Sequence, residues 1–114
     1  MGNEHPTPIA LPAKLLIAIF DARDEWEKRP LQDALVHVLE AHGISGVTVF
    51  SGVTGYGVHG RAHRKGLIGL PHDKPTALFV IDNDAKLRAV LPTIRPMIVE
   101  GIVVLIDAEV IPSI

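Results

Sequence analysis

Three short segments of this chain are apolar at successive positions, and this feature constrains the fold more than any other. They run Leu15–Phe20, Ala77–Ile81 and Ile102–Ile106, and their length and composition predict β-strands. A strand with one face in water alternates apolar with polar residues. Because these segments do not alternate, we expect apolar side chains on both faces of the sheet, and both faces need a cover.

Two segments between the strands have apolar residues at helical spacing. The first has its stripe at Leu31, Ala34, Leu35, Val38 and Leu39. Pro30 suits the first turn of this helix and Gly43 its C-terminal cap. The sequence therefore predicts a helix between these two residues.

The second helical stripe is interrupted by prolines. It consists of Leu87, Val90, Leu91, Ile94 and Ile98. Asp82, Asn83 or Asp84 is a candidate N-cap. Pro92 and Pro96 each remove a backbone donor, so we expect a kink or a break near Leu91.

The order of the elements predicts the fold class. Strands at Lys14–Phe20, Gly46–Gly52, Pro75–Asp82 and Gly101–Ile111 give β-α-β-β-α-β with the two helices. This is the ferredoxin-like α+β arrangement, a four-stranded antiparallel sheet with two helices on one face. Its other face is open, so the apolar strands predict a second copy of the chain there. Terminal residues folded over that face are the alternative.

Composition limits the class of protein. The 114 residues predict one domain at 14–114, after a flexible N-terminal arm at 1–13 that does not resemble a signal peptide. A net charge of −2 argues against a nucleic-acid binder. The absence of cysteine excludes disulfides and thiolate sites, and no apolar run is long enough for membrane insertion. We expect a cytoplasmic protein.

The long connection at about residues 52–74 is the candidate binding site. It is rich in glycine, and the chain has no acidic residue from Ala41 through His72. Clustered glycines let backbone N–H groups approach an anion, and phosphate is the natural ligand of such a surface. The candidate ligand-binding residues are Gly52, Gly55, Tyr56, Gly57, His59, Arg61, His63, Arg64 and Lys65. A solvated loop that binds nothing is the alternative.

Two other clusters have simpler interpretations. His59, His63 and His72 carry imidazoles that suit zinc, copper or nickel, but histidines in a surface loop are more often free of metal. The charged segment Asp21–Pro30 contains paired carboxylates, and we interpret it as a solvated loop with Trp26 against the body. Arg23, Lys28 and Arg29 of that segment are also candidates to reach a ligand across a subunit boundary. We find no catalytic set, and predict that the protein is not an enzyme.

The chain resembles a known family at several motifs. They are the G-x-x-G-[FY]-G core at Gly52, Gly55, Tyr56 and Gly57, His63 downstream, "LP" before the third strand and "GIVVLIDAEVI" at the end. These motifs resemble those of the family called domain of unknown function 190, which is grouped with the PII-like proteins. The resemblance covers Lys14 to about Ile111. The PII signal proteins and the CutA proteins share its fold.

The resemblance implies a ferredoxin-like subunit in a homotrimer whose open sheet faces pack around a threefold axis. It implies a loop that contacts effectors, nucleotides in clefts between subunits, and an unidentified target protein. The function expected is regulatory ligand sensing, with an adenine nucleotide as effector and no resident cofactor. A divalent-metal-binding protein of CutA type and a protein-interaction module without a small ligand are the alternatives.

Overall fold

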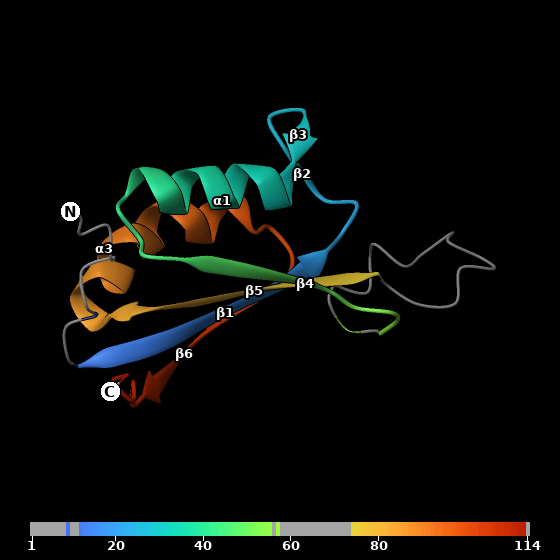
Figure 1. Ribbon diagram of the computed structural model, residues 1–114. Coiled ribbons are helices and arrows are strands. Elements are labelled where there is room, and N and C mark those ends of the chain that lie inside the picture. The colour runs from blue at the N-terminus through green and yellow to red at the C-terminus, as the bar shows by residue number, and fades with distance from the viewer. Residues whose placement is uncertain (1–8, 10–11, 56, 58–73, 114) are drawn as a thin grey trace, which may run out of the picture.

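The computed structural model describes residues 9, 12–55, 57 and 74–113. Along these the elements are β1 (Ala13–Asp21), β2 (Glu25–Trp26), β3 (Arg29–Pro30), α1 (Leu31–Ala41), β4 (Val47–Ser51), β5 (Pro75–Asn83), α3 (Asp84–Ile94), the 3-10 turn η1 (Arg95–Met97) and β6 (Ile102–Ala108). Apart from β2 and β3, the order is the predicted β-α-β-β-α-β (Figure 1). The ferredoxin-like α+β class is confirmed.

The four long strands form one antiparallel sheet in the order β4-β5-β1-β6. Because β1 and β4 both run antiparallel to β5, they run parallel to each other, and α1 connects them. By the same reasoning β5 and β6 are parallel, and α3 connects them. Such connections are almost always right-handed, which places both helices on the same face of the sheet (Figure 1).

The core lies between the sheet and the two helices. Side chains from β1 and β5 meet the apolar stripes of α1 and α3 there, as the helical spacing predicts. The buried cluster contains Leu16, Ala18, Phe20, Leu31, Ala34, Leu35, Leu39, Ile44, Leu78, Val80, Leu87, Val90, Ile94, Met97 and Ile98.

The helix ends follow the sequence signals except at the prolines. Pro30 stands just before α1, and Asn83 caps α3 by accepting a hydrogen bond from the Lys86 N–H at 2.7 Å. The α-helix continues through Pro92 to Ile94 and only then tightens into η1, so the break expected near Leu91 is wrong. The buried side chains of Val90 and Ile94 account for this, because their packing opposes the loss of one backbone hydrogen bond.

The segment between β1 and α1 forms a small hairpin that the sequence did not predict. Strands β2 and β3 pair across a turn at Glu27 and Lys28, whose φ angles are 51° and 67°. Two consecutive positive φ angles are those of a type I′ turn, which glycine and asparagine usually form. The hairpin projects beside the start of α1 (Figure 1), while Trp26 packs against the core as predicted.

The face of the sheet opposite the helices is apolar and open. One row across it contains Val104, Ile17 and Phe79, which are paired in register. The rings of Phe50 and Phe79 make an edge-to-face contact with centroids 5.0 Å apart. We call this surface the open face; its most exposed members are Phe50, Phe79, Ile81, Ile102, Val104 and Ile106, at 37–51% exposure. The expectation of apolar side chains on both faces is confirmed.

Candidate functional site

The glycine-rich connection leaves the sheet between β4 and β5, at the end of the sheet where the β1–β2 turn also lies (Figure 1). Gly52 begins it. Its N–H donates to the Pro75 carbonyl at 2.7 Å, and a Cβ at this position would come within 2.5 Å of the Pro75 ring. Only glycine fits this close approach, so Gly52 holds the first stem of the loop against the start of β5.

The next two glycines of the motif have different local roles. Gly55 lies beside the Pro75 ring, where an added Cβ would make an ordinary contact at 3.4 Å. Gly57 has a φ of 100°, in the region that side chains disfavour. The motif therefore combines one close approach of the backbone, at Gly52, with one left-handed residue, at Gly57. The conformation of the backbone accounts for glycine at these two positions.

The second stem of the loop is held at the end of β1, beside Asp21. The Ala22 N–H donates to the Lys74 carbonyl at 2.8 Å, which joins the end of β1 to the residue before β5. The Asp21 carboxylate is fully buried and accepts two hydrogen bonds from the Arg23 guanidinium, at 2.8 and 2.7 Å. It also accepts one from the Arg23 backbone N–H at 2.8 Å. A buried carboxylate needs such partners, since an unpaired charge there would be strongly destabilising.

This anchor was missed by the sequence analysis, which interpreted Asp21–Pro30 as a solvated loop. The available signal was the position of Asp21 directly after an apolar strand, with a cation two residues later. Arg23 pairs with a carboxylate of its own chain and remains half-exposed. Part of the charge next to the loop is therefore already balanced.

A second buried carboxylate lies at the opposite end of the sheet. Asp82 accepts hydrogen bonds from the N–H and hydroxyl of Ser45, both at 3.0 Å, and pairs with Lys86 at 3.1 Å. Burial acts to raise the pKa of Asp82, but the combined hydrogen bonds from Ser45, Asn83 and Lys86 outweigh it and lower the pKa below the usual 3.8. Every oxygen of Asp82 has a partner, so its role is to join the α1–β4 connection to β5.

The predicted binding residues divide into two groups. Gly52, Gly55 and Gly57 are described, and the first two lie together at Pro75. Tyr56, His59, Arg61, His63, Arg64 and Lys65 lie outside the described residues, as does His72 of the metal alternative. Their roles stay predictions. The described ranges contain no group of three potential metal ligands and no helix long and apolar enough to cross a membrane.

The fold is similar to that of solved PII-like proteins. The protein CPII from Thiomonas intermedia K12, a nitrogen regulatory PII-like protein in complex with ADP, AMP and bicarbonate, has a TM-score of 0.66 at 18% identity. This match covers 90% of our chain and 97% of CPII. A structure of CPII with ADP and bicarbonate has a TM-score of 0.63 at 21% identity, covering 87% and 88% of the two chains. The TM-scores establish similarity of fold.

Two proteins are similar to this chain in sequence. A UPF0166 protein of Aquifex aeolicus (strain VF5) is 31% identical over 99 residues, which cover 86% of this chain and 93% of the relative. A UPF0166 protein of Methanocaldococcus jannaschii is 29% identical, with 86% and 91% coverage. The family model of DUF190, described as "Uncharacterized ACR, COG1993", matches residues 13–110. The expected resemblance is confirmed, and the chain belongs to the DUF190 family.

Proposed function

We propose that this protein is a PII-like regulatory protein that binds a small anionic metabolite. An adenine nucleotide is the candidate ligand. In this proposal the ligand lies in clefts between subunits of a homotrimer, at the base of the 52–74 loop. Ligand binding changes the surface that the loop presents to a target protein, and no chemical reaction follows. The CPII structures with ADP and AMP support the choice of nucleotide, because CPII has the same fold.

The observation that carries the proposal is the anchoring of both stems of the loop. Gly52 is held at Pro75, and Lys74 is held at Ala22 next to the buried Asp21. A connection of this length without fixed ends would present its glycines and cations at no defined place. With fixed ends, the backbone N–H groups of Gly55 and Gly57 start from a defined position at one end of the sheet. Backbone N–H groups that are held in a turn can form an anion-binding concavity, so the fixed stems support a phosphate site here.

The loop supplies the remaining groups in this proposal. Arg61, Arg64 and Lys65 neutralise the phosphates, because guanidinium and ammonium groups form charge-assisted hydrogen bonds with them. Tyr56 stacks on the base. His59 and His63 contribute further ring N–H donors. These roles are assigned from residue chemistry and from the resemblance to the family.

The open face supports the proposed assembly. Its isoleucine, valine and phenylalanine side chains are more exposed than a stable monomer would be expected to leave in one contiguous patch. Copies of the chain that pack these faces against one another would bury them and create clefts between subunits. We propose three copies by analogy with PII proteins.

The proposal is tested by calorimetry and thermal unfolding of the full chain with ATP, ADP and AMP, with the assembly mass measured in parallel. A ligand specific for the folded state stabilises by about 2.7 kcal/mol at one hundred times its dissociation constant. We expect one nucleotide to bind, and to protect residues 52–70 from hydrogen exchange. Unchanged hydrogen exchange at saturating ligand would contradict the proposed change in the surface of the loop.

Charge variants assign the binding to the loop. Arg61→Ala and Arg64→Ala should each weaken nucleotide binding by about tenfold or more, the effect of losing one charge-assisted hydrogen bond. Arg88→Ala is the matched control, because Arg88 is an exposed arginine on α3 already paired with Asp84 at 2.8 Å. Equal losses in all three variants would indicate a general charge effect and reject the loop as the phosphate site.

A further inference from the structure

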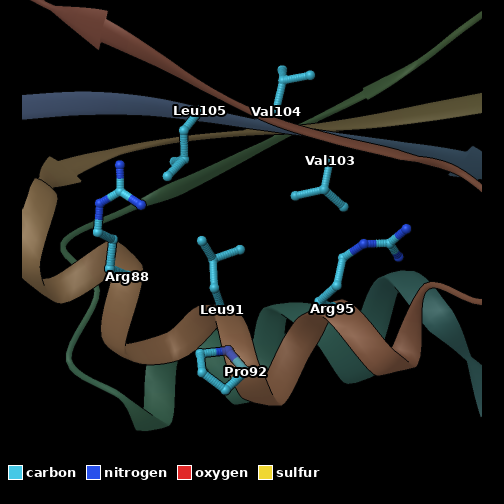
Figure 2. Close-up of a pocket in the computed structure, with 7 residues that line it drawn as sticks. All are labelled: Arg88, Leu91, Pro92, Arg95, Val103, Val104 and Leu105. Atoms are coloured by element: carbon cyan, nitrogen blue, oxygen red, sulfur yellow. The ribbon is translucent and has the colours of Figure 1, made fainter.

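A groove of about 550 Å³ lies between α3 and β6, at the edge of the sheet opposite β4. It is lined by Arg88, Leu91, Pro92, Arg95, Val103, Val104 and Leu105 (Figure 2). The volume is in the range of small-molecule sites, roughly 300–1,000 Å³. Because β6 has no neighbour on its outer side among the described strands, the groove is open along the edge of the sheet.

The floor of the groove is apolar. Leu91 points from α3 toward the sheet, while Val103 and Leu105 point from β6 toward the helix (Figure 2). All three pack against the core and remain only half-buried. Val104 points to the opposite face and belongs to the open face. An apolar ligand would therefore gain contact here without displacing any core side chain.

The two arginines at the groove differ in their surroundings. Arg88 donates its Nε–H to Asp84 at 2.8 Å. It also lies near Asp107, whose pKa is lowered mainly by the hydrogen bond and charge of Lys14 and to a smaller extent by Arg88. The positive charge of Arg88 is therefore balanced by carboxylates of the chain itself.

Arg95 has no such balance. One of its Nη1–H groups donates to the Ile98 carbonyl at 2.7 Å, and no described carboxylate pairs with it. This hydrogen bond holds the guanidinium at the end of α3 and uses one of its five N–H donors. The remaining N–H groups can donate to an anionic group from outside. A held, unneutralised guanidinium beside an apolar floor is a pattern that favours an amphiphilic anion.

We propose that the groove between α3 and β6 binds a small amphiphilic anion. Its carboxylate or phosphate group pairs with Arg95, and its aliphatic or aromatic part lies on Leu91, Val103 and Leu105. The site uses no residue of the 52–74 loop. It is therefore separate from the proposed nucleotide site, and it remains if that proposal fails.

The test is a titration of the isotope-labelled full chain followed by amide NMR shifts. The probes are octanoate and octyl phosphate, which distinguish a carboxylate from a phosphate ligand. Octanamide keeps the tail without the charge, and acetate keeps the charge without the tail. We expect at least one of the two amphiphilic anions to shift the amides of Leu91, Val103 and Leu105. We expect each control compound to bind at least about tenfold more weakly, because octanamide lacks the charged group and acetate lacks the apolar tail.

Two matched variants distinguish the contributions of Arg95 and Arg88 to ligand binding. Arg95→Gln should weaken binding of the better probe by about tenfold or more, as expected for a lost charge-assisted hydrogen bond. Arg88→Gln should change it by less than about threefold, because the charge of Arg88 is already paired. Arg29→Gln, on the exposed strand β3, controls for net charge.

Three results would overturn the proposal. The first is an absence of shifts at millimolar concentrations of both anions. The second is binding of octanamide as tight as that of octanoate, which would indicate general apolar adsorption. The third is a response confined to Phe50 and Phe79, which would place the tail on the open face. Unchanged dispersion of the Arg95→Gln spectrum would establish that the variant is folded.

Discussion

The two faces of the sheet are built from the same kinds of residue but have opposite surroundings. In β1, Leu16 and Ala18 lie against the helices at 0% and 1% exposure. Their neighbour Ile17 lies on the other face, in the row with Phe79 and Val104, and is only half-buried. Composition therefore does not identify which face is the core. The connections through α1 and α3 decide it, because they place both helices on one side.

The largest effect should come from the helix-covered face. Leu16→Ala removes a fully buried side chain and should lower the free energy of unfolding by about 2–5 kcal/mol. The loss should not depend on protein concentration, because this site is buried within one chain. Denaturant unfolding at several protein concentrations measures it. Ile17→Ala is the matched variant on the open face, and its cost should depend on concentration if copies cover that face. Equal, concentration-independent costs would remove the distinction between the faces.

The next effect concerns assembly. If copies pack through the open face as proposed, Phe79→Asp places a charge in the middle of the interface and should weaken self-association by about hundredfold, roughly 2.7 kcal/mol. The fold of each subunit should persist, because the Phe79 ring does not contact the helices. Sedimentation gives the mass and circular dichroism the fold. A variant that keeps the wild-type mass would show that the open face is not the interface.

A smaller effect should appear with pH on the covered face. Asp82→Asn leaves Lys86 without a carboxylate and should destabilise by about 1–3 kcal/mol at pH 7. Because the folded-state pKa of Asp82 is depressed, its contribution is present above the unfolded value near 3.8 and is lost as pH falls through the folded value. The wild type should therefore lose stability more steeply than Asp82→Asn below about pH 4.

Unfolding by urea at a series of pH values from 7 to 2 measures this difference. Ser45→Ala removes one hydrogen bond to the carboxylate while retaining the charge, so its pH dependence should lie between those of the other two proteins. Parallel curves for wild type and Asp82→Asn would mean that Asp82 does not carry the acid sensitivity.

The smallest effect should come from a site on neither face. Lys28 has a φ of 67°, where a side chain costs roughly 1–2 kcal/mol and glycine avoids that cost. Part of the gain is offset by the greater freedom of glycine in the unfolded chain, so Lys28→Gly should stabilise by about 0.5–1 kcal/mol. Thermal unfolding measures it, with Lys28→Ala as the control that removes the charge but keeps the strain. Equal stability of the two variants would argue against a strained turn.

Local patterns predicted the regular elements well. The stripe from Leu31 to Leu39 predicted α1, and the polar residues around Asn83 predicted the start of α3. A kink or a break was expected near Leu91, but the α-helix continues through Pro92 to Ile94, where the flanking side chains pack into the core. The hairpin at Glu27 and Lys28 was not predicted, because neither residue belongs to the usual type I′ pair.

The candidate site was predicted in part. The glycine spacing at positions 52, 55 and 57 marked the loop, and the close approach of Gly52 to Pro75 gives a physical reason for its first member. The anchor beside Asp21 was not predicted, because the hydrogen bond from Ala22 to Lys74 joins segments far apart in the sequence. The α3–β6 groove was missed for the same reason.

The sequence by itself determined the order of the elements, the apolar character of the strands and the position of a glycine-rich, acid-free connection. These properties depend on neighbours along the chain, within about one helical turn or two strand residues. Only the tertiary structure decided which strand face became the core, and which of the two groove arginines, Arg88 and Arg95, kept an unbalanced charge. Such outcomes depend on burial and charge pairing between segments far apart in sequence, and these follow from how the helices cross back over the sheet.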